Sequence, residues 1–315
     1  MKRFCVVLAV VSLLLCASGC GQSEQGSLAT APPPTASTAT PGKDAPIAIP
    51  KATDPVALSP QPMGDLGNFY VEIRELQISE DHNGNSVAII TYSFTNNSEE
   101  SIMPAAAVSD SAYQNGVELE TAFLYNKDGY DFDADTRKIQ SGVSVDIPVA
   151  FYLSSDTAPI EFEVSKIASL GSEIVCKTFE IAEGGVTELS VAPKGNIDFE
   201  VGEFSVSVVS YRISEDYSGA PILVLELGVT NNGNSARGFM FSVDLTAFQN
   251  GIELSSAFSP DDVDQYTQGA NLKPGNGVAV YCAYVLADES PVTFELSELF
   301  SFDSQVQTFT IDITQ

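Results

Sequence analysis

The stretch Ala112–Phe123, "AYQNGVELETAF", returns 135 residues later as Ala247–Phe258, "AFQNGIELSSAF", with eight of the twelve positions identical. The match extends without a gap over Ile78–Phe123 and Ile213–Phe258, with 17 identities in 46 positions. A period of this length indicates whole domains in tandem, because solenoid repeats are much shorter. The sequence therefore predicts two copies of one domain, copy 1 at residues 65–182 and copy 2 at residues 198–315, joined by a linker at residues 183–197.

The centre of the repeated phrase predicts a tight hairpin in each copy. Asn-Gly is the pair preferred in a two-residue type I′ turn, where both residues take a positive φ. The pairs are Asn115-Gly116 and Asn250-Gly251. After the first pair, apolar Val117 and Leu119 alternate with two glutamates, as a half-buried strand requires. The repetition is explained first as folding information, and a binding site installed twice is the alternative.

Both copies read as strands throughout, with period-two alternation and turn signals about every ten residues. In copy 1 the expected strands are 69–78, 86–95, 104–113, 117–123, 143–153, 160–167 and 174–181. This number and size predict an all-β protein of two tandem immunoglobulin-like antiparallel β-sandwich domains. The antibody-type core marks are absent, since the chain has no Trp and copy 1 and copy 2 each have one Cys. Cys176 and Cys282 occupy unmatched positions, so we interpret both as core residues rather than a disulfide.

The alternation slips in the first long strand of each copy. Val71 and Ile73 share one parity while Leu76 and Ile78 share the other, and the slip recurs in copy 2. We expect a β-bulge that turns both sets inward, near Arg74-Glu75 and near Val209-Ser210. The strands that follow, "SVAIITYSFT" and "PILVLELGVT", begin with consecutive apolar residues. They are expected to be central and covered on both faces.

The N-terminus has the pattern of an export signal. Residues 1–19 give a basic start, an apolar run shorter than a membrane span, and small residues before Cys20. "ASGC" is similar to a lipobox, which makes Cys20 the lipidated first residue of the mature chain; the alternative is a secreted protein cut at the same bond. Residues 20–64 are rich in Pro, Thr, Ala and Ser and are expected to form a disordered tether.

The acidic excess lies in the two copies. Copy 1 has 20 Asp and Glu against 6 Lys and Arg, and copy 2 has 17 against 3. Such a surface is repelled by phosphates, which excludes nucleic acid as a direct partner. Cationic partners and divalent metals stay open. Acidity that keeps an exported protein soluble and monomeric is the general explanation.

Several phrases together carry a resemblance to a known family. A lipobox and tether are followed by "YSFTNNS" or "LGVTNNG", "QNGVELE", and "SGVSVDIPVAFYL" or "KPGNGVAVYCAYVL". This set resembles a domain-of-unknown-function family of immunoglobulin-like domains on lipoproteins of Gram-positive bacteria, here in two tandem copies. The resemblance implies a fold and a place at the outer face of the cell membrane. It brings no catalytic residues with it.

The residues offer little support for catalysis. The one histidine, His82, lies in the turn-like "SEDHNGNS" and has Tyr217 as its counterpart in copy 2, so a solvated turn residue is expected. The chain contains no nucleophile elbow, zinc-ligand spacing or phosphate-binding glycine loop. We therefore expect no catalytic residues and no enzymatic activity.

One loop of copy 1, Tyr125–Asp135, "YNKDGYDFDAD", concentrates the candidate binding groups. Its carboxylates suit Ca²⁺, and its aromatic rings suit a sugar or a basic peptide. The EF-hand spacing fails at Thr136 and Gly142, where that loop needs Gly and Glu. The candidate metal ligands are Asp128, Asp131, Asp133 and Asp135, and the candidate ligand contacts are Tyr125, Tyr130 and Phe132. A solvated acidic loop and rings that cap the sandwich are the alternatives.

The expected function is that of a non-enzymatic cell-surface lipoprotein, a binding or envelope-accessory module that presents two acidic sandwich domains. Its partners would be the membrane, through the lipid on Cys20, and a protein or glycan. A Ca²⁺-stabilised surface module is the second hypothesis. An enzyme, a hydrolase without a recognisable motif, is the third.

Overall fold

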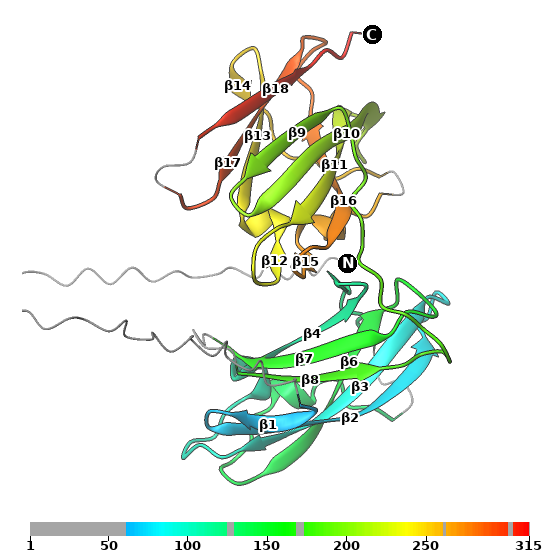
Figure 1. Cartoon of the computed structure of the whole chain (residues 1–315), viewed down its shortest axis with the longest axis vertical. Coiled ribbons are helices and arrows are strands. Elements are labelled where there is room, and N and C mark those ends of the chain that lie inside the picture. Colours follow the sequence, from blue (N-terminus) through cyan, green and yellow to red (C-terminus); the bar gives the residue numbers. More distant parts are fainter. Residues whose placement is uncertain (1–60, 125–128, 168–172, 261–262, 302–304, 315) are drawn as a thin grey trace, which may run out of the picture. The chain divides into compact units, whose positions relative to one another are not determined.

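The structure is a computed structural model, and it describes residues 61–124, 129–167, 173–260, 263–301 and 305–314. The signal peptide, Cys20 and nearly all of the expected tether lie outside these residues. Among the described residues, no helix is both long enough and apolar enough to cross a membrane. Both copies consist of strands, short 3₁₀ turns and loops, which confirms the all-β prediction (Figure 1).

Copy 1 is a sandwich of two antiparallel layers, to each of which it contributes four strands. The order in one sheet is β1 (Met63–Leu66), β2 (Phe69–Glu80), β3 (Ser86–Asn96) and β6 (Ser144–Tyr152). The other layer has the order β5 (Val117–Glu118), β4 (Val108–Gln114), β7 (Ile160–Lys166) and β8 (Ile174–Phe179). Two 3₁₀ turns, η1 (Pro104–Ala106) and η2 (Ala134–Thr136), lie in the connections. The layers enclose a core that includes Tyr92, Phe94 and Phe162.

Copy 2 repeats this arrangement strand for strand. One sheet has the order β9 (Ile197–Val201), β10 (Phe204–Glu215), β11 (Pro221–Asn231) and β16 (Gly277–Val285). The other has the order β14 (Ile252–Glu253), β13 (Val243–Gln249), β17 (Val292–Glu298) and β18 (Gln307–Ile311). Two short strands, β12 (Arg237–Gly238) and β15 (Asn271–Leu272), pair with each other, and β15 pairs with β5, so the second sheet of copy 1 has six strands in the order β12-β15-β5-β4-β7-β8. The turns η3 (Phe239–Phe241) and η4 (Gln265–Gln268) complete copy 2. The prediction of two tandem immunoglobulin-like sandwiches is confirmed.

Two boundaries differ from the sequence-based expectation. The first strand, β1, begins at Met63, inside the segment assigned to the tether, and pairs with β2 as a short hairpin edge. The expected strand 104–113 begins as the 3₁₀ turn η1 and becomes a strand only at Val108. Pro104 at the start of η1 explains the turn, because its fixed φ suits a helical start and it has no N–H for a ladder.

The two predicted hairpin turns are present. Asn115 and Gly116 have φ values of 49° and 74°, and Asn250 and Gly251 have 51° and 77°. Positive φ at both central residues is the mark of a type I′ turn. The strand after the first turn is shorter than expected, since β5 ends at Glu118 and the chain then crosses to the other sheet, where Thr121 bridges Phe151.

The predicted bulges are also present, but the second set of side chains is buried only in part. The register of β2 on β3 shifts between Ile73 and Glu75, and that of β10 on β11 shifts between Val208 and Ser210. Val71 and Ile73 are buried, whereas Ile78 is 44% exposed. In copy 2, Tyr211 and Ile213 are likewise exposed. Leu76 is half-buried and packs against the main core, so the inward orientation expected for the second set holds at that residue. It is wrong for Ile78, Tyr211 and Ile213, which are exposed.

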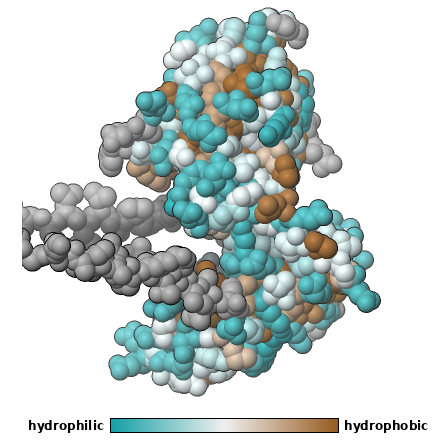
Figure 2. Space-filling view, in the orientation of Figure 1, coloured by the Kyte–Doolittle hydropathy of each residue, from teal (hydrophilic) through white to brown (hydrophobic). Residues whose placement is uncertain are grey.

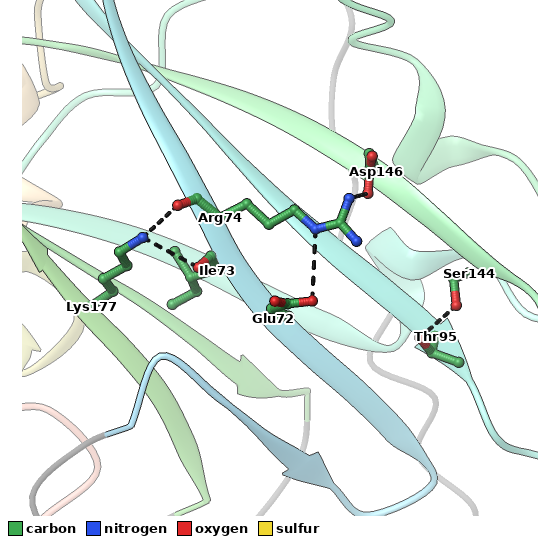
Figure 3. A network of polar contacts seen from close by, with 7 residues as sticks. All are labelled: Glu72, Ile73, Arg74, Thr95, Ser144, Asp146 and Lys177. Carbon is green, nitrogen blue, oxygen red and sulfur yellow. Dashed lines mark hydrogen bonds and ion pairs between the residues drawn. The ribbon is translucent and has the colours of Figure 1, made fainter.

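Charged side chains form hydrogen bonds and ion pairs with the residues of the bulge in copy 1 (Figure 3). The Lys177 ammonium donates to the backbone carbonyls of Ile73 and Arg74, the residues where the ladder is interrupted. The Arg74 guanidinium bonds Asp146 on β6 at 2.6 Å and lies 3.7 Å from Glu72. These contacts are exposed and solvated, so each one contributes little to stability.

The central strands are buried on both faces, as expected. Nine of the eleven residues of β3 are buried, and β11 has nearly the same pattern. The inner face of β3 contributes to the main core, and its outer face forms a second cluster with Ala122, Leu124 and Ala150. Most of the surface in view in Figure 2 is hydrophilic, with scattered hydrophobic side chains.

Candidate functional site

Buried amides in each repeated phrase have structural roles that account for much of the repetition. The Gln114 side chain donates to the carbonyls of Ser155 and Ala158 at 2.9 and 2.8 Å, and its oxygen accepts from the N–H groups of Ser154 and Ser155. It thereby ties β4 to the β6–β7 loop. Its counterpart Gln249 makes equivalent bonds to residues 287–290.

The "TNN" phrase contributes a second repeated amide. Asn96 is fully buried and donates to the carbonyls of Glu100 and Ile139 at 2.8 and 2.9 Å. Asn231 donates in the same way to Ser235 and Leu272 at 2.8 and 2.7 Å. A buried amide with its hydrogen bonds filled specifies one loop geometry. Sequence reasoning missed both amide pairs, although their identity in the two copies was visible.

The copies diverge at a pocket in copy 1, which we name the Asp110 pocket. It has a volume of about 300 Å³ and lies where β4, the segment after β5, η2 and β6 meet. Its lining combines three carboxylates with a mostly apolar wall. The lining residues are Asp110, Thr121, Ala122, Phe123, Leu124, Phe132, Asp133, Asp135, Pro148, Val149 and Ala150.

Asp110 is the unusual member of this pocket. It shares the inner-face parity of β4 with Val108 and Ala112, and it accepts a hydrogen bond from the buried Tyr92 hydroxyl at 3.3 Å. Burial raises the pKa of Asp110 to about 6, against the lowering effect of the Tyr92 bond and with a further increase from Asp135. Burial is also the main cause of a raised Asp135 pKa. The surroundings of Asp110 and Asp135 therefore disfavour the ionised form of these two carboxyls.

Copy 2 has apolar residues at the positions that correspond to Asp110 and Tyr92. The gapless match aligns Asp110 with Leu245 and Tyr92 with Leu227. Leu227 is fully buried, and Leu245 packs against the same core. The Leu245 carbonyl accepts a hydrogen bond from the Tyr284 hydroxyl at 3.1 Å. The copy 2 framework thus holds together with apolar groups where copy 1 has a carboxyl and a phenol. The sequence alignment of the two copies was enough to mark Asp110, because it pairs this aspartate with a leucine.

The predicted metal ligands are only partly brought together. Asp133 and Asp135 line the Asp110 pocket. Asp131 forms an exposed ion pair with Arg137 instead. Asp128 lies outside the described residues.

The predicted aromatic contacts lie against the outer face of the sheet. Tyr130 and Phe132 are half-buried and pack on the cluster of Val87, Ile89 and Leu124, with their ring centroids 5.9 Å apart. The Tyr130 hydroxyl donates to Gln77 at 2.7 Å. Phe132 also lines the pocket, whereas Tyr125 lies outside the described residues.

Phe123, which the sequence did not single out as a contact, is 77% exposed at the rim of the pocket. Its counterpart Phe258 is also 77% exposed. Phe closes the repeated phrase in both copies, so one aromatic ring projects into solvent at the same position of each. Exposure of a large ring at a pocket mouth suits ligand contact.

A second cluster of titratable groups is already occupied by a cation of the chain. Glu161, Glu163 and Cys176 converge within 4.8 Å of one another. The ammonium of Lys273, from copy 2, lies 2.6 Å from Glu161 and 2.8 Å from Glu163, and 4.5 Å from the centre of the Tyr113 ring. The carboxylates raise the pKa of Lys273 despite its burial. This cluster is therefore a cross-copy ion pair.

The two cysteines and the histidine lie outside the Asp110 pocket. Burial raises the pKa of the Cys176 and Cys282 thiols to about 12, so both are protonated at neutral pH. Both are free and buried, as the sequence predicted. His82 is exposed beside Asp81, which accepts backbone bonds from Asn83 and Asn85, so the expected turn is confirmed.

Comparison with known proteins gives the family. The chain matches the profile of a domain of unknown function, DUF5067, at residues 60–166 and again at residues 187–298. The protein belongs to this family. The two matched segments correspond to copy 1 and copy 2, so the family unit is present twice. The predicted resemblance is confirmed. No match was found among curated proteins.

Solved structures with similarity to this member of the DUF5067 family come from several bacteria. One is described as a "putative lipoprotein from Staphylococcus aureus subsp. aureus NCTC 8325", with 15% identity over 38% of this chain and 88% of that one, and a TM-score of 0.31. A protein from Enterococcus faecalis has 20% identity over 40% and 95%, with a TM-score of 0.31. The exo-chitosanase CsxA of Amycolatopsis orientalis has 14% identity over 75% and 26%, with a TM-score of 0.23.

Proposed function

We propose that this protein is a non-enzymatic binding module, anchored to the outer face of the bacterial cell membrane by a lipid on Cys20, and that copy 1 holds its cation-binding site. The anchor rests on the lipobox and on the tether that follows it. Two acyl chains hold a protein at a membrane where a single chain does so only marginally. Copy 2 serves as a second domain of the same fold, with Leu245 in place of Asp110.

The binding role rests on Asp110, because ionisation of its carboxyl destabilises copy 1. Asp110 is half-buried, and a carboxylate withdrawn from water without a cation destabilises its domain. Leu245 of copy 2 shows that the same fold accommodates an apolar side chain at that position. Shifted titratable groups that gather in a pocket favour a functional site. A cationic ligand would offset the desolvation of Asp110 and the repulsion from Asp135.

A cation panel tests this function directly. The mature chain, residues 20–315 with Cys20→Ser, is titrated by calorimetry with n-butylammonium, CaCl₂ and MgCl₂. At least one of these cations should bind, and Asp110→Asn should weaken it about tenfold or more. Asp244→Asn removes one exposed carboxylate from copy 2 and should change nothing. If none of the cations binds, the proposed site is wrong.

The anchor has its own test. Cells that express the full chain are grown with a radiolabelled fatty acid, and the protein is recovered by antibody. Label should enter the wild-type chain and be lost in Cys20→Ala. Secretion of an unlabelled wild-type chain would contradict membrane anchoring and favour the secreted alternative.

A Ca²⁺-stabilised module remains the second candidate, favoured by one observation. Two of the predicted ligands, Asp133 and Asp135, share the pocket with Asp110. Binding to the folded state alone raises the melting temperature. Melting in millimolar CaCl₂ should then occur at a higher temperature than melting with a chelator. An unchanged midpoint would remove this candidate.

A further inference from the structure

The Asp110 pocket has room for more than a lone metal ion. Its volume of about 300 Å³ equals the share of roughly ten water molecules in the liquid. Calcium needs six to eight oxygen ligands within about 2.6 Å. Among the described residues, the three aspartates of the pocket do not form a group of convergent ligand atoms, whereas Glu161, Glu163 and Cys176 do. The dimensions favour an organic cation.

The apolar wall indicates what the cation is attached to. Ala122, Leu124 and Ala150 are buried, and Phe132 and Val149 are half-buried. A wall of this kind gains energy when a hydrocarbon chain covers it. Among the described residues, no Lys or Arg lines the pocket, and the neighbouring Arg137 is paired with Asp131. A cation on an apolar stem therefore meets both surfaces at once, as a lysine side chain does.

The edge strand β6 favours recognition through a side chain, and the neighbouring strand β3 has a buried hydroxyl without a partner among the described residues. β6 is the last strand of its sheet, and Pro148 on it lacks an N–H, so a peptide strand cannot extend the ladder there. Opposite Pro148 is Thr91, whose hydroxyl is buried and has no hydrogen-bond partner among the described residues. Its counterpart in copy 2 is Glu226, which bonds Ser210 and Tyr281.

The exposed ring at the rim adds a preference for an aromatic neighbour. Phe123 projects into solvent at the pocket mouth. Aromatic pairs contribute beyond the area they bury, and a ring also attracts an ammonium group. A ligand with an aromatic residue next to its cation can contact Phe123 while the cation reaches the carboxylates.

On the basis of the cation site proposed above, we infer that the pocket of copy 1 receives the lysine side chain of an extracellular peptide in which an aromatic residue adjoins that lysine. The stem lies along the wall formed by Leu124, Phe132 and Val149. The ammonium group meets Asp110 and Asp135, and the aromatic neighbour packs on Phe123.

Four probes on the mature Cys20→Ser chain test this inference by calorimetry. They are acetyl-Phe-Lys-amide, acetyl-Phe-norleucine-amide, acetyl-Ala-Lys-amide and CaCl₂. The first should bind best. Norleucine keeps the stem without the charge and should weaken binding about tenfold or more. Alanine in place of Phe should weaken binding about threefold, and Phe123→Ala should remove that difference. Phe258→Ala in copy 2 is the matched control and should leave binding unchanged.

The outcomes separate this inference from the proposed function. Equal binding of the Lys and norleucine peptides would overturn the lysine assignment, and so would binding of CaCl₂ without binding of either Lys peptide; the latter leaves the cation site standing. Absence of binding by every probe would overturn both. Phe123 is exposed, so its variant is expected to fold, and retained amide protection in hydrogen exchange verifies this.

Discussion

Copy 1 and copy 2 share a frame and differ in what β4 and β13 present to the interior. Both have the Asn-Gly turn, the buried amides and the bulge. Copy 1 places Asp110 against Tyr92, where copy 2 has Leu245 and Leu227. The frame is therefore independent of the pocket. Equivalent changes to the shared residues should destabilise each copy by a similar amount. Changes at the pocket should affect copy 1 alone.

The largest expected effect comes from a shared residue. Gln114→Ala should destabilise copy 1 by about 3 kcal/mol, because it leaves several buried backbone groups without partners. Gln249→Ala should destabilise copy 2 by a similar amount. Hydrogen exchange resolved to β4 and β13 measures the two copies separately. If only one of the two variants lost stability, the buried amide would not contribute equally to the two copies.

The next effect is confined to copy 1 and depends on pH, and it amounts to about 2 kcal/mol once solvent screening of the half-buried carboxyl is included. The pKa of Asp110 is raised in the folded state, from 3.8 to about 6. The wild-type copy 1 should therefore lose stability as pH rises from about 4 to about 6. Asp110→Asn should remove this loss and be the more stable form at pH 7.5. Urea unfolding followed by exchange at β4 measures it. A parallel pH curve for the two proteins would contradict burial of the charge.

A smaller effect separates the two turns. Gly116→Ala and Gly251→Ala both place a side chain at positive φ, which costs about 1 kcal/mol in each turn. A Cβ on Gly116 would also lie 2.3 Å from the Asn276 side chain of copy 2, whereas nothing lies within 4 Å at Gly251. The Gly116 variant should lose about 1 kcal/mol more. Equal losses would show that the contact with Asn276 yields without cost.

The smallest effect concerns the bulge. Lys177→Met removes the ammonium group that donates hydrogen bonds to the carbonyls of Ile73 and Arg74 (Figure 3). Copy 2 has Phe309 at that register position. Copy 1 should lose about 0.5 kcal/mol, because the contact is solvated. Denaturant unfolding checks the loss, and a loss several times larger would mean that Lys177 holds the bulge in place.

Local patterns predicted the parts of the fold that depend on local rules. The Asn-Gly turns, the positions of the bulges and the buried central strands follow from turn chemistry and alternation, and they are confirmed. The amide of Gln114 could not be assigned in this way, because its partners at Ser155 and Ala158 lie about 40 residues away. The inward set expected at Ile78 failed because the facing sheet does not cover that end of β2.

The site was less accessible to sequence reasoning than the fold. The acidic loop was found, and two of its aspartates line the pocket. Asp110 was overlooked, although its parity with Val108 and Ala112 and its match to Leu245 marked it as an acid on a buried face. Phe123 was part of the quoted phrase, but exposure of its ring depends on the chain leaving the sheet after Glu118.

The central claim is that the copies share a frame and that only copy 1 binds. Hydrogen exchange of the mature chain with and without saturating acetyl-Phe-Lys-amide tests it most directly. Protection should appear in β4, residues 119–124 and β6 of copy 1, be lost in Asp110→Leu, and be absent from β13 and β16 of copy 2. Equal protection of both copies, or protection that survives Asp110→Leu, would contradict the account.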